Sequence, residues 1–266
     1  MSEKLRTLTP EEVKRLACWF EREMGIDIAF YRQEFLARRF LPRAAAMGFR
    51  DICQYLDHAD GNEGEKRMAR KRLLVPTTEF FRNRDVFVAF LDCLKRSPAL
   101  ACRKELVLAS APCSTGEEAL SLAILCEEMS LDAKVLALDR SVPSLKQAAC
   151  GRYNKKAFSK LDKIEIKRYF KEEGSIRTLE DRVLKKVFPV CCDLRYGLPL
   201  KAVHAVFMRN FFIYLADEAQ NEVISGVKKV LVDGGLLVLG KVERLRMNAG
   251  DWTALDLGSK IYMLKK

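Results

Sequence analysis

The sequence predicts an α/β protein in which an all-helical N-terminal region precedes a mostly parallel β-sheet covered by helices on both faces. Up to about residue 75, apolar residues recur at intervals of three and four, the spacing of amphipathic helices. After Pro76, short apolar runs alternate with helical stretches, which is typical of a parallel sheet between two helical layers. A third stretch, about residues 168–192, breaks this alternation. We therefore expect a helical domain over residues 1–75 and an α/β domain over residues 76–266.

The first region contains two apolar stripes at helical spacing. One comprises Val13, Leu16, Ala17 and Phe20, and the other comprises Phe35, Leu36, Phe40 and Ala44. Gly25, Gly48 and the cluster Asp60–Asn62 are residues typical of helix ends and turns. These signals predict about four or five helices joined by short loops.

The second region alternates between strand and helix patterns. We expect strands over Glu105–Ser110, Ala133–Leu138, Ala202–Phe207, Gly235–Gly240 and Ile261–Leu264. We expect helices over Glu117–Met129, Pro143–Ala149 and Glu218–Leu231, with a turn at Asp233–Gly235. Within residues 168–192, Ser175–Leu179 and Val183–Val190 resemble a small antiparallel insertion bounded by charged turns.

Composition indicates an ordinary soluble protein with a basic surface. The 266 residues are 49% hydrophobic and 31% charged, and the net charge is +11. This charge favours an acidic partner, which could be nucleic acid, an anionic membrane or a carboxylate-rich protein. No secretory signal pattern or bilayer-length apolar stretch is found, so we expect a cytoplasmic protein without membrane insertion.

Nine cysteines and two histidines give no metal-binding pattern, because no Cys-x-x-Cys pair or ligand-spaced histidine pair occurs. We expect free, mostly buried thiols and no bound metal.

The loop after the first predicted strand indicates a nucleotide-like ligand. The strand leads into Ala-Ser-Ala-Pro-Cys-Ser-Thr-Gly, where the first crossover of such a sheet binds its ligand. Gly116 is the single glycine, whereas a dinucleotide fingerprint has three, so a dinucleotide and an NAD-dependent dehydrogenase are disfavoured. Asp139 ends the second strand, about 20 residues past the helix start, where a ribose-binding acid belongs. A helix cap is the equally weighted alternative for Asp139.

Four segments, in order, resemble motifs of the CheR-type chemotaxis receptor (protein-glutamate) O-methyltransferases. These are Thr77–Arg82, Ser110–Ala123, Ala137–Asp139 with Leu145, Ala148, Gly151 and Tyr153, and Met208–Tyr214. The correspondence covers nearly the whole chain. It implies a class I (Rossmann-like) methyltransferase domain with a small antiparallel β insertion, preceded by a helical substrate-docking domain.

The resemblance also implies activity and site residues. The activity would be methyl ester formation on receptor glutamates, with S-adenosylmethionine as methyl donor and S-adenosylhomocysteine as product. The implied cofactor-binding residues are Thr78, Arg82, Glu118, Asp139, Asp193, Leu194, Arg209 and Asn210. Arg82 would also steer the substrate carboxylate, and Tyr214 would sit beside the departing methyl group.

Some positions depart from the family pattern. Pro76, Asp193, Lys241 and Ala119–Leu120 stand where the family has asparagine, asparagine, histidine and Pro-Tyr. Two alternatives therefore stay open: a noncatalytic protein that binds S-adenosylmethionine or S-adenosylhomocysteine, and an RNA or DNA methyltransferase. The nucleic-acid reading is disfavoured because Arg209–Phe212 lacks the prolines of a base-methylating platform.

A basic stripe on the second predicted helix is the expected docking surface for the acidic cytoplasmic helices of receptors. Arg32, Arg39 and Arg43 share one face, and the family's basic docking helix favours this role over a solvated face for Arg39 and Arg43. Lys171–Ser175, in the insertion, has a single glycine. We therefore expect a weak or absent C-terminal peptide tether to the receptor.

Overall fold

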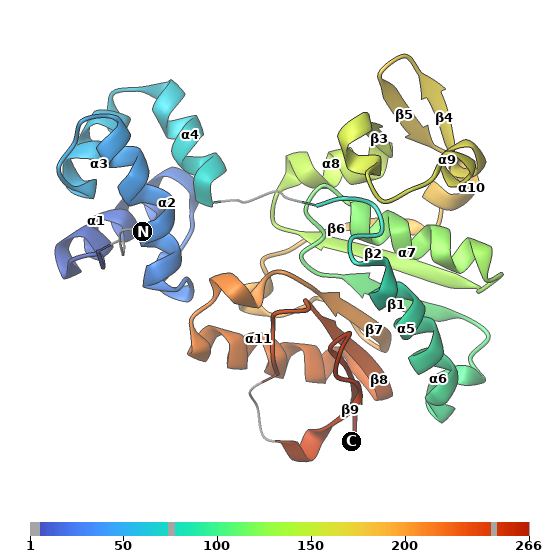
Figure 1. Ribbon diagram of the computed structural model, residues 1–266. Helices are drawn as coiled ribbons and strands as arrows, with labels where there is room; N and C mark the ends of the chain where they lie inside the picture. The colour runs from blue at the N-terminus through green and yellow to red at the C-terminus, as the bar shows by residue number, and fades with distance from the viewer. Residues whose placement is uncertain (1–5, 74–77, 246–248, 266) are drawn as a thin grey trace. The chain divides into compact units, whose positions relative to one another are not determined.

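The computed structural model describes residues 6–73, 78–245 and 249–265, and the chain forms two compact units (Figure 1). One unit contains Met1–Pro76 and Tyr214–Gln220, and the other contains Thr77–Ile213 and Asn221–Lys266. The first unit therefore includes a short segment from late in the chain. Pro76 and Thr77 lie outside the described residues.

The helical unit packs its helices around one apolar core. It contains α1 (Pro10–Met24), η1 (Ile28–Phe30), α2 (Gln33–Ala46), α3 (Ile52–Asp60) and α4 (Glu63–Leu73). Thr9 and Glu12 form a capping box at the start of α1, and left-handed Gly25 ends it. The predicted stripes supply core residues such as Leu16, Phe20, Leu36 and Phe40.

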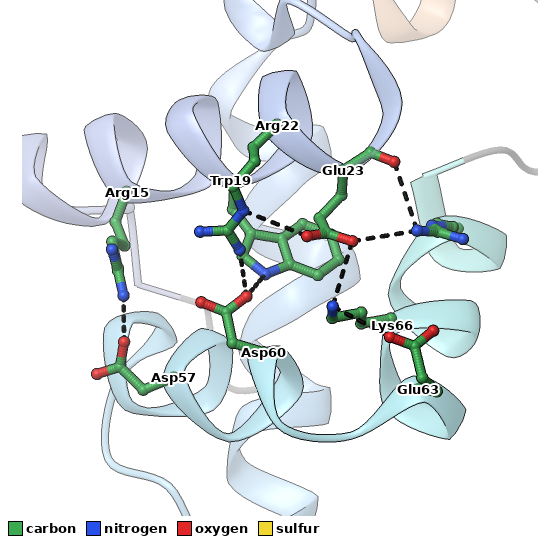
Figure 2. Close-up of polar contacts among 9 residues, drawn as sticks. Arg15, Trp19, Arg22, Glu23, Asp57, Asp60, Glu63 and Lys66 are labelled. Atoms are coloured by element: carbon green, nitrogen blue, oxygen red, sulfur yellow. Dashed lines mark hydrogen bonds and ion pairs between the residues drawn. The ribbon is translucent and has the colours of Figure 1, made fainter.

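Polar contacts bind α1 to α3 and α4 on the outside of this core (Figure 2). Arg15 pairs with Asp57 and Arg22 with Asp60, while the Trp19 indole N–H donates to Asp60 at 2.6 Å. Glu23 lies 3.6 Å from Lys66 of α4. Charged side chains of α1 therefore help to join the helices of this unit.

The second unit is built on a seven-stranded sheet in the order β6-β2-β1-β7-β8-β10-β9. Its strands are β1 (Leu106–Ser110), β2 (Ala133–Asp139), β6 (Val187–Cys191), β7 (Val203–Met208), β8 (Leu231–Leu239), β9 (Trp252–Asp256) and β10 (Ile261–Leu264). The neighbours from β6 to β8 are parallel, and β10 is antiparallel to β8 and β9. This mixed sheet and its crossovers confirm the class I, Rossmann-like prediction.

Helices cover the sheet because their apolar faces require burial. They are α5 (Arg84–Arg96), α6 (Pro98–Ala101), α7 (Glu117–Glu128), α8 (Val142–Cys150) and α11 (Asp217–Val230). α7 is almost wholly buried, and α8 packs against β2 and β6. No helix among the described residues has the length and apolar character needed to cross a bilayer.

The small antiparallel sheet has the order β3-β5-β4, formed by Arg152–Asn154, Ile176–Leu179 and Phe170–Glu173. It accompanies η2 (Lys155–Phe158), α9 (Lys163–Tyr169) and α10 (Asp181–Leu184). The insertion was predicted, but its boundaries of 168–192 were wrong at both ends. It begins with β3, and Val187–Cys191 leaves it to pair in parallel with β2 of the main sheet.

The turn expected at Asp233–Gly235 lies inside β8. At this point the pairing of β8 with β7 is irregular.

Candidate functional site

Three of the predicted cofactor-binding residues, Glu118, Asp139 and Arg209, lie at the carboxyl ends of β1, β2 and β7. Within the sheet, β1 lies between two parallel neighbours: β2 pairs with one edge of β1, and β7 pairs with its other edge. The strand order therefore reverses between β1 and β7. Open α/β sheets bind ligands at this kind of switch point, where the diverging loops leave a crevice.

The loop after β1 is held by the neighbouring strands. Its Ala111 N–H donates to the Phe207 carbonyl at 2.8 Å, and its Cys113 N–H donates to the Leu138 carbonyl at 2.7 Å. At its end, Gly116 has φ +98°, and a Cβ there would lie 2.4 Å from the Ala148 Cβ. Only glycine allows α7 to begin this close to α8.

Asp139 lies at the end of β2 and is buried. Its carboxylate accepts the backbone N–H of Ser114 at 2.9 Å and of Ser141 at 2.8 Å. Burial raises the pKa of Asp139, although these hydrogen bonds oppose the shift. A carboxylate has about four lone-pair positions, so capacity remains for hydroxyl donors of a ribose. The alternative of a helix cap was wrong, because Ser141 is the N-cap of α8.

Glu118, in the first turn of α7, is joined to Arg209 after β7. The Ser110 hydroxyl donates to one Glu118 oxygen at 2.8 Å, and Arg209 donates to the other at 3.1 Å. Arg209 also donates to the Arg82 carbonyl at 2.9 Å and to the Asn83 side chain at 2.8 Å. Its side chain is 1% exposed, and its Nε has no hydrogen-bond partner. A buried cation with an unused donor suits a ligand carboxylate.

The linker before α5 is fixed by contacts from both sides. The Phe81 N–H donates to the Ser121 hydroxyl at 2.9 Å, and Ser121 donates to the Glu117 carbonyl at 2.6 Å. Phe80 packs in an aromatic cluster that includes Tyr153 of β3. These contacts hold Arg82, while Thr78 is half-buried at the edge of the described segment.

Asp193 and Leu194 begin η3 (Leu194–Tyr196) after β6. The Asp193 carboxylate accepts from Arg195 Nε at 2.9 Å and lies 3.8 Å from Arg140. Burial alone would raise the pKa of Asp193, but the hydrogen bonds from Arg195 hold it below its ordinary value. Leu194 is buried. The negative charge of Asp193, which stands where the family has asparagine, is thus balanced by Arg195 of the same chain.

Asn210 follows Arg209 in a left-handed conformation, with φ +59°. Its N–H donates to buried Glu243 at 3.0 Å. Lys241, which stands where the family has histidine, pairs with Asp85 at 2.5 Å.

Tyr214 is not grouped with these residues, because it belongs to the helical unit. There its ring lies 4.7 Å from the ring of Phe35, and its carbonyl accepts the Arg32 N–H at 2.8 Å. Its suggested place beside the transferred methyl group stays a prediction.

The expected docking arginines have contacts within the helical unit. Arg43 donates to both oxygens of buried Glu65, at 2.8 and 2.5 Å, and Tyr55 donates to the same carboxylate at 2.8 Å. Arg39 is half-buried, with its guanidinium 5.5 Å from the ring centre of Phe35. Arg43 is thus engaged by a carboxylate of its own unit, whereas Arg39 contacts an aromatic ring, and the docking role of both stays a prediction.

The cysteines are all free, but the expectation that most are buried was wrong. Cys93, Cys113 and Cys126 are buried, whereas Cys18, Cys102, Cys150 and Cys191 are exposed. Within the described residues, no group of three or more His, Cys, Asp or Glu side chains could hold a metal.

Sequence reasoning missed several residues that shape the site. Asn83 and Ser121 hold the linker, and Glu243 holds the loop after β7. Tyr153 was noted only as part of a motif, yet its hydroxyl donates to the Thr115 carbonyl. The sequence signal that could have indicated Glu243 was an acidic residue soon after the apolar run of β8.

Comparisons with known proteins agree with this architecture. Residues 76–260 match the family described as CheR methyltransferase, SAM binding domain, and residues 11–74 match its all-alpha domain. The chain is 29% identical to "Probable biofilm formation methyltransferase WspC" of Pseudomonas aeruginosa over 84% of its length, and it spans little more than half of that protein, 56%. It is 26% identical to the chemotaxis protein methyltransferase of Escherichia coli, covering 100% of this chain and 94% of that protein. A SAM-dependent O-methyltransferase structure from Thermotoga maritima has 16% identity and a TM-score of 0.36, covering 64% of this chain and 48% of that one.

Proposed function

The chain belongs to the CheR methyltransferase family, and on that premise we propose that it transfers a methyl group from S-adenosylmethionine to glutamate side chains of chemotaxis receptors in the cytoplasm. The observation that carries the proposal is the convergence of Asp139, Glu118 and Arg209 at the strand ends of the matched domain. The E. coli relative named a chemotaxis protein methyltransferase supports the choice of substrate.

The residues present fit the methyl donor. The Asp139 carboxylate would accept hydrogen bonds from the ribose hydroxyls. Glu118 would bind the methionine ammonium. It lies in the first turn of α7, next to the point where the strand order reverses, and its carboxylate can accept further hydrogen bonds. Arg209, with its unused Nε donor, would bind the methionine carboxylate. Thr78, Leu194 and Asn210 would complete the pocket.

The reaction itself places few chemical demands on the protein. When bound, S-adenosylmethionine supplies a methyl group activated by a positively charged sulfur. A glutamate side chain, with a pKa of about 4.3, is ionised near neutral pH and needs no general base. An oxygen–carbon bond forms as the sulfur–carbon bond breaks, which gives a methyl ester and S-adenosylhomocysteine with no proton transferred. The chain must therefore align the reactants and exclude water, and alignment can supply roughly 7–11 kcal/mol.

Arg82 is our candidate for steering the substrate carboxylate, since its backbone is fixed by Arg209. Tyr214 is the candidate for holding the transfer geometry. Arg39 and Arg43 would contact the acidic receptor helices, Arg43 while it remains paired with Glu65. We keep the expectation that a C-terminal receptor peptide binds weakly or not at all.

The test is methyl transfer to purified receptor cytoplasmic domains, using S-adenosylmethionine labelled in its methyl group. We expect label that alkali releases as methanol, which is diagnostic of a carboxyl methyl ester. Replacing the modified glutamates by alanine should abolish the signal, and Asp139→Ala in the enzyme should reduce it. Alkali-stable label would contradict ester formation.

One observation favours a second candidate, a noncatalytic binding protein. Asp193 and Lys241 differ from the family, and both are engaged with charged residues of the chain itself, Arg195 and Asp85. Binding of S-adenosylhomocysteine without transfer to any receptor preparation would favour this candidate. Transfer to nucleic acid, with affinity that falls steeply with salt, would instead identify a nucleic-acid methyltransferase.

A further inference from the structure

Glu243, just beyond β8, has a buried carboxylate surrounded by backbone N–H groups. The Gly240 N–H donates to it at 2.6 Å, the Asn210 N–H at 3.0 Å and the Ile213 N–H at 3.3 Å. The side chain therefore joins the end of β8 to the loop after β7. The residue is 3% exposed, so water competes little for these hydrogen bonds.

Backbone dipoles compensate the charge of this carboxylate. Among the described residues, no salt bridge to Glu243 is found, and nearby Lys241 pairs with Asp85 instead. Converging N–H groups form an anion-binding nest of the kind that also holds phosphates. Burial raises the pKa of Glu243, while the hydrogen bonds from Gly240, Asn210 and Ile213 oppose that rise. A carboxylate is costly to bury unless it is hydrogen-bonded, and these backbone N–H groups supply the hydrogen bonds.

The segments that it joins are in close contact. A Cβ at Gly240 would lie 2.6 Å from Glu243 Oε2 and 3.0 Å from the Asn210 nitrogen. Asn210 itself has φ +59°, a conformation that costs free energy for a residue with a side chain. The hydrogen bond that the Asn210 N–H donates to Glu243 stabilises that conformation.

We propose that Glu243 is a positioning residue of the cofactor site, and that it fixes the Arg209–Ile213 loop so that Arg209 and Asn210 present their side chains to S-adenosylmethionine. This inference rests on the proposed function, because it assumes that the cofactor binds at the end of β7. The same carboxylate also accepts the N–H of Ile213, at the end of this loop.

The test compares Glu243→Gln with Glu12→Gln. Both replace a buried carboxylate that accepts backbone N–H groups, but Glu12 lies in the helical unit. In Glu243→Gln, the new amide NH₂ faces backbone donors and one acceptor is lost. We expect the Kd for S-adenosylhomocysteine, measured by calorimetry, to rise about tenfold or more, since a hydrogen bond to a charged group has that weight. Amide hydrogen exchange in peptides covering residues 209–214 should accelerate.

Glu12→Gln should leave both the Kd and the exchange of residues 209–214 unchanged while lowering stability. If Glu243→Gln lowers stability but keeps the wild-type Kd, Glu243 has only a structural role and the inference is overturned. If Glu243→Gln does not fold, Glu243→Asp, which keeps the charge but shortens the reach, is measured in the same way, with the same outcomes. Failure of the wild-type chain to bind the cofactor would instead refute the proposed function, and this inference with it.

Discussion

At the scale of single residues, Arg209 connects three segments that are far apart in the sequence. Its guanidinium contacts Glu118 of α7, the Arg82 carbonyl and the Asn83 side chain, and it lies 5.8 Å from the ring centre of Phe87. A cation this deeply buried is tolerated only because each contact offsets part of its desolvation. The residue therefore has a structural role as well as its proposed cofactor role.

Arg209→Met should destabilise the second unit strongly. The substitution leaves Glu118 without its cation, and the loss of one partner of a buried pair costs about 3–5 kcal/mol. Urea unfolding followed by circular dichroism measures the effect. Lys134→Met is the control, because its pair with Glu105 is exposed to solvent and should contribute little to stability. Equal losses for both variants would contradict the role assigned to Arg209.

At the scale of elements, the start of α7 depends on its contact with α8. Gly116 combines a positive φ of +98° with a Cβ position 2.4 Å from the Ala148 Cβ. Gly25 also has a left-handed backbone, with φ +60°, but nothing lies within 4 Å of its Cβ position, so the two glycines separate backbone strain from packing.

Gly116→Ala should therefore cost more than Gly25→Ala. Backbone strain contributes about 1–2 kcal/mol at either site, and overpacking against α8 adds about 1–3 kcal/mol at Gly116 alone. Thermal unfolding of the two variants, each followed through its own unit, compares them. A Gly25→Ala loss as large as that of Gly116→Ala would show that α8 can move away at little cost.

In the helical unit, Glu12 joins the start of α1 to the start of α3. Arg6 donates to its two oxygens at 2.7 and 2.6 Å, and the Thr9 and Ile52 N–H groups donate at 2.9 and 3.1 Å. The hydrogen bonds from the Arg6 guanidinium lower the pKa of Glu12 to about 2. Because the pKa is lower in the folded state than in the unfolded chain, the stabilisation is complete above the unfolded value and is lost as the pH falls through the folded one.

Glu12→Gln should cost about 2 kcal/mol at pH 7 and flatten the pH dependence of unfolding between about pH 5 and pH 2. Trp19, buried in the helical unit, reports its unfolding by fluorescence when Trp252 is replaced by phenylalanine. A pH dependence identical to that of the parent protein would show that Glu12 does not titrate as described.

At the scale of the whole molecule, the sequence predicted both units because each repeats a simple pattern. Helical stripes become the core of the first unit, and apolar runs become β1, β2 and β7. It misplaced Val187–Cys191 because β6 is an edge strand with exposed Phe188 and with Pro189, and its partner residues in β2 lie 52 positions earlier in the chain. Pairing with β2 is a long-range choice that a local pattern does not encode.

The places of candidate-site residues in the fold were predictable where motifs end strands, as at Asp139 and Arg209, whose roles stay predictions. Residues that act through distant partners were not predictable: Ser121 holds Phe81, and Glu243 holds Asn210. The docking stripe shows the opposite error, because helical spacing put Arg43 on a basic face without revealing that Glu65 already binds it. Likewise, nothing local indicated that Tyr214–Gln220 joins the helical unit.

The central claim is that the carboxyl ends of β1, β2 and β7 bind S-adenosylmethionine through Asp139 and its neighbours. Calorimetric titration with S-adenosylmethionine and S-adenosylhomocysteine tests it most directly, using the wild-type chain, Asp139→Ala and Lys134→Met as a control away from the site. We predict that the wild type binds both compounds and that Lys134→Met binds each of them as tightly as the wild type does. Asp139→Ala should bind neither compound measurably. Wild-type affinity in folded Asp139→Ala, or no binding by the wild-type chain, would contradict the account.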